Sequence, residues 1–284
     1  GLGDVYKRQI LSFLWIAPIL IVFLNSFKRK AFIFTHPFSL SCYSITEGWD
    51  KFKAGITRAF CGWLNYSNGI RKTNLWECFG TSLFITIGSV ALIILCCSMC
   101  AWYITRVHTK VTKTIYVLCL FSMIVPFQMV MFTLSKFANI LHLSNPLGII
   151  IVYLGFGAGL AVFMFTGFVK GISLEIEEAA MIDGCSPLQT FFKVVFPILK
   201  PTTVTVAILE AMWVWNDYLL PYLVLSSKYR TIPIAVQYLK QSHGQIDWGA
   251  MMAVLVLAIL PIIIFYIACQ KYIIEGVLAG AVKG

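Results

Sequence analysis

The sequence predicts an all-α, polytopic membrane protein with six transmembrane helices. Of its 284 residues, 59% are hydrophobic and 12% are charged, and the mean hydropathy is +0.84. Charged residues normally make up about a quarter of a soluble domain, so this chain is too apolar for that class. A helix needs about 20 apolar residues to cross a bilayer, and six runs reach or approach that length. They are approximately residues 10–27, 79–103, 115–134, 147–169, 202–225 and 248–270.

The first apolar run, residues 10–27, is the shortest, and Lys7 and Arg8 directly before it give it the flank of a signal peptide. A signal peptide ends in small residues at its cleavage site, whereas residues 25–27 read Asn-Ser-Phe. We therefore expect this run to be retained as a helix. We also expect residues 1–284 to form a single transmembrane domain.

A long polar segment, residues 28–74, follows the first run and is aromatic and mixed in charge. It is predicted to be an extracytoplasmic cap. Cys42 and Cys61 lie in it, and a disulfide between them is one alternative if the cap faces an oxidising space, although the sequence does not fix their geometry. The nine cysteines of the chain show no metal-ligand spacing.

A second polar segment, residues 170–200, separates the fourth and fifth runs and is predicted to form two short helices. Ser173 is a suitable N-cap for the first of them. Glu175, Glu177 and Glu178 follow in its opening turns, where the helix dipole favours negative charge. The segment therefore begins with a well-specified helix.

The break between the two short helices is predicted at Gly184, where a helix C-terminus needs a residue that tolerates positive φ. Residues 186–189, Ser-Pro-Leu-Gln, then supply a capping-box serine, a proline at the first helical position and a glutamine at the third. Pro197 and Pro201 close the segment before the fifth run.

Two acidic residues, Glu210 and Asp217, lie within the fifth apolar run, where charge is costly and therefore suggests function. They are seven residues apart, so they lie on one face of a helix, with Trp213 between them and Asn216 adjoining. Carboxylate, indole and amide groups suit a sugar, which offers hydroxyls and apolar ring faces. The alternative is that Asp217 pairs with a basic loop residue or with a partner subunit near the outer end of the run.

The sequence offers no site for catalysis. Its histidines are scattered over separate loops, no Ser/His/Asp or Cys/His arrangement converges within a predicted element, and no phosphate-binding glycine loop occurs. We therefore expect no enzymatic activity, no metal and no cofactor. The net charge of +10 is carried by loops beside apolar runs, so anionic lipid is the expected partner rather than nucleic acid.

The spacing within segment 170–200 resembles the EAA loop of ABC importer permeases. Glu-Ala-Ala is followed after three residues by Gly and, after nine more, by Val194, Phe196 and a proline. The residues that match this coupling motif are Glu178, Ala179, Ala180, Asp183, Gly184 and Pro197. Residues 215–218, Trp-Asn-Asp-Tyr, and the C-terminal tail are similar to the maltose-type second permease of the carbohydrate family.

This resemblance implies the type I ABC importer permease fold in a bacterial cytoplasmic (inner) membrane. It also implies three kinds of partner: a second homologous permease, two cytoplasmic ABC ATPase subunits and an extracytoplasmic solute-binding protein. Membrane lipid is the further partner, expected from the charge of the loops. ATP hydrolysis would reside on the ATPases and would drive alternating access. Segment 170–200 would seat in the ATPase, with Glu178 accepting a charge-assisted hydrogen bond from a basic residue there.

Three points stay open at the level of the sequence. A permease for glycerol phosphate or another polyol derivative is one alternative, and a self-contained secondary carrier is another. The positive-inside rule does not decide the orientation, because segment 28–74 is itself rich in lysine and arginine. The resemblance places Glu178, and with it both termini, in the cytoplasm.

Overall fold

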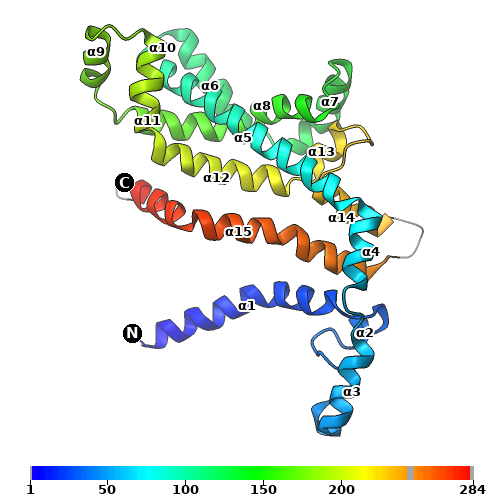
Figure 1. Ribbon diagram of the computed structural model, residues 1–284. Coiled ribbons are helices and arrows are strands. Elements are labelled where there is room, and N and C mark those ends of the chain that lie inside the picture. Colours follow the sequence, from blue (N-terminus) through cyan, green and yellow to red (C-terminus); the bar gives the residue numbers. More distant parts are fainter. Residues whose placement is uncertain (1, 242–245, 282–284) are drawn as a thin grey trace. The chain divides into compact units, whose positions relative to one another are not determined.

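The structure is a computed structural model that describes residues 2–241 and 246–281, and within them it is built of helices without a strand (Figure 1). The all-α class is therefore confirmed. The helices are α1 (Leu2–Ser26), α2 (Lys30–Thr35), α3 (Trp49–Ala59), α4 (Leu64–Thr73), α5 (Leu75–Arg106), α6 (Lys110–Ile124), α7 (Phe127–Ile140), α8 (Pro146–Val169), α9 (Leu174–Ile182), α10 (Pro187–Thr190), α11 (Phe196–Ile198), α12 (Lys200–Asn216), α13 (Leu219–Val224), α14 (Ile232–Gln241) and α15 (Trp248–Ala281).

Four of these helices are long and apolar enough to cross a membrane. These spans are Val5–Ser26, Leu75–Arg106, Pro146–Val169 and Trp248–Tyr272. Two further candidates are bent helix pairs, Lys110–Ile124 with Phe127–Ile140 and Pro187–Ile198 with Lys200–Asn216. Counting each bent pair once gives up to six spans, in agreement with the predicted number.

The prediction of a continuous helix over residues 115–134 is wrong. Helices α6 and α7 meet there at 108°, and Val125 between them is extended, with φ −74° and ψ 116°. The cause is Pro126, whose ring disfavours the helical conformation of the residue before it.

The prediction of one helix over residues 202–225 is also wrong. Helix α12 ends at Asn216, Asp217 is extended, and the short helix α13 follows. Pro221 has no N–H to donate to the carbonyl of Asp217, so the backbone hydrogen bond that would continue the helix through this position cannot form. The Asp217 carboxylate instead accepts hydrogen bonds from the N–H groups of Leu219 (3.0 Å) and Leu220 (3.4 Å).

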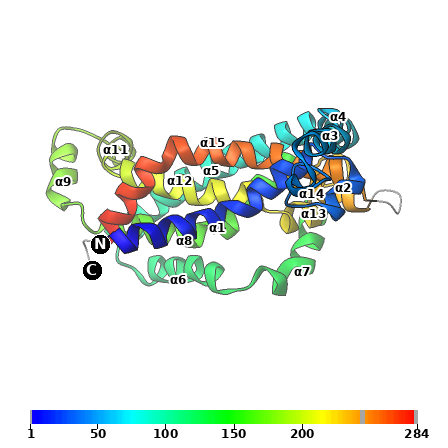
Figure 2. The same cartoon turned by 90° about the horizontal axis from the view of Figure 1, so that it is seen from below.

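The chain folds into two compact units, Gly1–Phe79 with Thr231–Ile264, and Gly80–Arg230 with Phe265–Gly284. The single domain expected from the sequence stays a prediction. In the second unit, α6 and α12 both pack along α8 (Figure 2). A core that includes Ile93, Phe165 and Phe191 fills this unit.

In the first unit, segment 28–74 folds into α2, a 3₁₀ turn (Ile45–Glu47), α3 and α4. Lys28 is buried, and its ammonium donates to Asn25 Oδ1 (3.0 Å) and to the His36 carbonyl (2.9 Å). Cys42 and Cys61 are free thiols that contact the carbonyls of Gly55 (3.5 Å) and Phe27 (3.2 Å). The disulfide considered for this pair is therefore not formed.

Asp247 ties the start of α15 to α4 in the same unit. Its carboxylate accepts from the N–H of Ala250 (3.1 Å) and pairs with the ammonium of Lys72. Burial alone would raise the pKa of Asp247, but the hydrogen bonds and the positive charge of Lys72 outweigh it and lower the pKa. The carboxylate thus stays ionised at the helix N-terminus, where the dipole favours it.

Candidate functional site

The predicted caps of segment 170–200 are confirmed. Ser173 Oγ accepts from the N–H of Glu175 (3.3 Å) at the start of α9. Gly184 has φ +88°, the left-handed conformation expected after this helix. Ser186 and Gln189 form the reciprocal capping box at the start of α10, with Ser186 N–H donating to Gln189 Oε1 at 2.9 Å. Local sequence therefore holds this loop in a defined shape.

Helix α9 has an exposed face that combines apolar side chains with a charged one. Glu178, Met181 and Ile182 are spaced i, i+3 and i+4, so they share one side of the helix. Met181 is 45% exposed and Ile182 is 86% exposed. The Glu178 carboxylate is also exposed, and among the described residues it has no hydrogen-bond or ion-pair partner. An apolar patch beside an unpaired carboxylate is typical of a surface that meets another protein.

The other residues of the coupling motif lie on α9, in the turn that follows it and, for Pro197, on α11. Every motif residue is exposed apart from Ala180, which is half-buried. Besides Glu178, these residues are Ala179, Ala180, Asp183, Gly184 and Pro197. The two alanines add little bulk to α9, and the positive φ of Gly184 lets the chain turn back directly after it. The motif is thus accessible on α9 and in the turn at Gly184, and Pro197 is exposed on α11.

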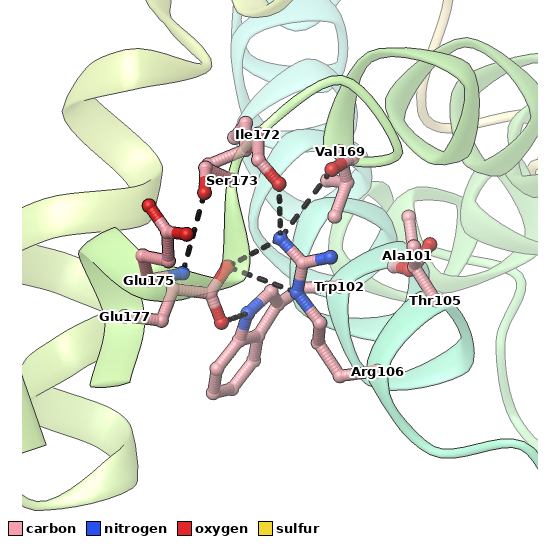
Figure 3. Close-up of polar contacts among 9 residues, drawn as sticks. All are labelled: Ala101, Trp102, Thr105, Arg106, Val169, Ile172, Ser173, Glu175 and Glu177. Carbon is pink, nitrogen blue, oxygen red and sulfur yellow. Dashed lines mark hydrogen bonds and ion pairs between the residues drawn. The ribbon is translucent and has the colours of Figure 1, made fainter.

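A buried acid, Glu177, fastens α9 to the rest of the second unit (Figure 3). Its side chain is 2% exposed. Oε1 accepts from Arg106 Nε (3.0 Å) and Nη2 (2.7 Å), and Oε2 accepts from Trp102 Nε1 (2.9 Å). Arg106 Nη2 also donates to the carbonyls of Val169 (3.5 Å), the last residue of α8, and of Ile172 (3.0 Å) just beyond it. We call this cluster of Glu177, Arg106 and Trp102 the Glu177 clamp.

Through Trp102, the Glu177 clamp also contacts the part of segment 170–200 that follows α10. The ring of Trp102 lies 5.4 Å from that of Phe191, which is fully buried. Phe191 begins a π-helical turn, Phe191–Val195, between α10 and α11. Helix α9 and the π-helical turn are therefore both held against the last turns of α5.

Sequence reasoning missed the Glu177 clamp, treating Glu177 only as an acid in the first turns of a helix. The available signal was weak. Trp102 and Arg106 are four residues apart at the end of an apolar run, so they share a helix face. Nothing in the sequence pairs that face with Glu177, 71 residues further along the chain.

The residues predicted to share one face of the fifth run all meet α8. Glu210 is 2% exposed and packs against Gly157, where an added Cβ would lie 2.9 Å from Oε2. Asp217 Oδ2 accepts from the Tyr153 hydroxyl at 3.0 Å. Trp213 meets the same tyrosine edge to face, with ring centroids 5.4 Å apart.

These contacts refine the sequence interpretation. Glu210 lies inside the second unit, whereas Trp213 remains 40% exposed beside Asp217. The side-chain partner of Asp217 in this structure is a tyrosine rather than the basic residue considered as an alternative. Asn216 is exposed, and its amide donates to the Met212 carbonyl of its own helix (2.7 Å). Tyr153, which sequence reasoning did not select, is the residue that joins Trp213 and Asp217.

No cluster of three or more His, Cys, Asp or Glu side chains able to hold a metal ion occurs in residues 2–241 and 246–281. His243 falls outside the residues that the structure describes.

Comparison with known proteins places these features in a family. Residues 93–278 match the family described as binding-protein-dependent transport system inner membrane component. The probable starch degradation products transport system permease protein AmyC of Thermoanaerobacterium thermosulfurigenes is 38% identical over 275 residues, which cover 96% of this chain and 94% of that protein. The multiple sugar-binding transport system permease protein MsmG of Streptococcus mutans is 32% identical over 271 residues, 94% of this chain and 91% of that protein.

A solved structure agrees with the sequence relatives at the level of the fold. A chain of a bacterial ABC transporter involved in the import of the acidic polysaccharide alginate superposes with a TM-score of 0.72 at 22% identity, covering 96% of this chain and 95% of that one. The type I permease fold is therefore confirmed, as is the predicted multi-pass membrane protein. The chain belongs to the family of binding-protein-dependent transport system inner membrane components.

Proposed function

We propose that this chain is a membrane-spanning permease subunit of an ATP-driven importer for carbohydrates. The family match over residues 93–278 supports a transport component that works with a solute-binding protein. Relatives named for starch degradation products, multiple sugars and melibiose, raffinose and stachyose support a carbohydrate as the solute. The aromatic and acidic groups at Trp213, Asp217 and Tyr153 are chemically suited to such a solute.

The main observation in support of an ATP-driven mechanism is the exposed face of α9. ATP hydrolysis would reside on two partner subunits, because the sequence has no phosphate-binding glycine loop. An isoleucine that is 86% exposed beside an unpaired Glu178 fits a contact with such a subunit. Movement of the ATPases would push α9, the paired permeases would rock, and the solute path would open alternately to each side.

The proposed orientation puts α9 and both termini in the cytoplasm of a bacterial cell, with segment 28–74 on the outer face. An epitope placed ahead of α1 tests this. It should be accessible to antibody in inside-out membrane vesicles and protected in intact spheroplasts. Accessibility in intact spheroplasts would contradict the orientation.

The experiment that tests the proposed function is gentle detergent purification of the tagged chain from its native cells, followed by reconstitution with whatever co-purifies. We expect a second permease and an ATPase to co-purify. Proteoliposomes containing them should take up radiolabelled maltooligosaccharide when ATP and the solute-binding protein are supplied. Uptake by this chain alone, driven by an ion gradient, would instead establish a secondary carrier. ATP-driven uptake of glycerol phosphate but no sugar would establish the polyol-phosphate alternative.

The proposed solute path gives a sharper prediction at Tyr153 and Asp217. Tyr153→Phe removes the hydrogen bond to Asp217 Oδ2, while Oδ1 stays bound to the backbone N–H groups of Leu219 and Leu220. Because Oδ2 is then no longer positioned, sugar uptake should fall about tenfold. Asp217→Asn should act in the same direction. Asn216→Ala is the matched control, because the Asn216 amide already bonds within its own helix, and its uptake should fall less. Equal uptake by wild type and Tyr153→Phe would remove Tyr153 from the path.

A further inference from the structure

A cavity of about 690 Å³ opens in the second unit where the end of α5, the start of α6 and the end of α8 come together. The coupling and solute-path residues discussed above do not line it. Its polar lining includes Arg106, His108, Lys110, Lys113, Thr166 and Lys170. The cavity is therefore a separate feature that shares only Arg106 with the Glu177 clamp.

The charge of this lining is strongly positive. The guanidinium of Arg106 is already paired with Glu177. Lys110, Lys113 and Lys170 are exposed, and within the described part of the chain none of them makes an ion pair or hydrogen bond through its ammonium. No acidic residue lines the cavity. Three unpaired ammonium groups around one hollow attract an anion.

The position of the cavity along the spans indicates which anion would reach these lysines. Two candidate transmembrane helices end beside it, α5 at Arg106 and α8 at Val169. The ends of transmembrane helices lie at the level of the lipid headgroups. Basic pockets between transmembrane helices at this level bind phosphate-bearing headgroups.

We propose that this cavity is a binding site for a phosphate-type anion, supplied by the headgroup of an anionic phospholipid. Lys110 and Lys113 reach the phosphate from α6, and Lys170 reaches it from the end of α8. Because Arg106 belongs to both the cavity lining and the Glu177 clamp, a bound lipid lies directly behind the residue that holds α9.

Native mass spectrometry of the full chain in detergent tests the proposal, with phosphatidylglycerol, phosphatidylcholine and inorganic phosphate as separate probes. We expect phosphatidylglycerol to remain bound and phosphatidylcholine to be lost. The triple variant Lys110→Gln, Lys113→Gln, Lys170→Gln should weaken phosphatidylglycerol binding roughly a hundredfold, at about fivefold for each lysine near a headgroup.

The matched control is Lys51→Gln, Arg71→Gln, Lys136→Gln, which removes the same charge from exposed positions on α3, α4 and α7. It should bind phosphatidylglycerol like the wild type. Binding of inorganic phosphate that only the cavity variant loses would keep the anion site but assign it to a soluble ligand. Equal phosphatidylglycerol binding by the cavity variant and the control would overturn the proposal.

Discussion

Glu177→Ala is expected to detach α9 from the rest of the second unit and to abolish coupled transport. The substitution leaves Arg106, whose side chain is 19% exposed, without its carboxylate and removes the acceptor of Trp102 Nε1. Breaking a buried ion pair by removing one partner costs about 3 kcal/mol or more. That loss should fall on the attachment of α9, because the caps of the helix at Ser173 and Gly184 remain intact.

Hydrogen exchange measured on the purified chain checks this expectation. Amides of Leu174–Ile182 should exchange roughly a hundredfold faster in Glu177→Ala, since about 3 kcal/mol corresponds to that factor. Amides in the middle of α8 should be unaffected. In the reconstituted importer, ATP hydrolysis should continue while solute uptake falls, because a loosened α9 still meets the ATPase but no longer moves α5.

Glu175→Ala is the matched control for the Glu177 clamp. Glu175 is also an acid in the first turn of α9, but its carboxylate is exposed and points away from Arg106 (Figure 3). Its removal should leave both exchange and transport near the wild-type values. Identical exchange in the Glu175→Ala and Glu177→Ala chains would mean that the Glu177 clamp does not hold the helix.

A double substitution distinguishes the effect of losing the packing contact between Arg106 and Glu177 from the effect of leaving one charge unpaired. Arg106→Met combined with Glu177→Leu replaces the buried ion pair by apolar groups of similar size, which is often neutral for stability. We expect this double variant to recover most of the exchange protection that Glu177→Ala loses. Recovery of protection without recovery of uptake would show that the hydrogen bonds of Arg106 to the end of α8 are needed for transmission as well.

The features that the sequence predicted correctly depend on residues close together in the chain. The capping box at Ser186 and Gln189 spans four residues, and the left-handed turn at Gly184 depends on one. Such interactions are decided by local backbone geometry, so their pattern is readable without a fold. The exposure of the coupling motif is less local, because Glu177 and Phe191 of the same segment are buried.

The features that the sequence did not predict depend on distant partners or on competition between local rules. The Glu177 clamp joins residues 71 positions apart, and the contact of Asp217 with Tyr153 joins residues 64 apart. The break in the fifth run could have been predicted from Pro221, four residues after Asp217. Apolar length favoured a continuous helix there, but the missing N–H of proline and the capping ability of aspartate prevailed.

Glu178→Arg is expected to release the ATPase while leaving the chain folded in the membrane. The Glu178 carboxylate is exposed and takes no part in the described hydrogen bonds, so its replacement breaks no described contact and costs only the small favourable interaction with the helix dipole. At the proposed interface, arginine would put a positive charge against the basic ATPase residue that glutamate is expected to meet. Juxtaposed like charges across an interface cost several kcal/mol, so ATPase recovery should fall roughly a hundredfold or more.

Co-purification of the tagged variant measures this loss, with the melting temperature of the chain as the check on folding. Glu47→Arg is the matched control, because it makes the same charge change at an exposed site on segment 28–74, which is expected on the opposite face of the membrane. Ile182→Asp should reproduce the Glu178→Arg result by a different route, since it makes the apolar part of the same face of α9 polar. Full ATPase recovery with both α9 variants would assign the exposed face of α9 to another partner, because a face that seats in the ATPase cannot lose its charge and its apolar anchor without effect.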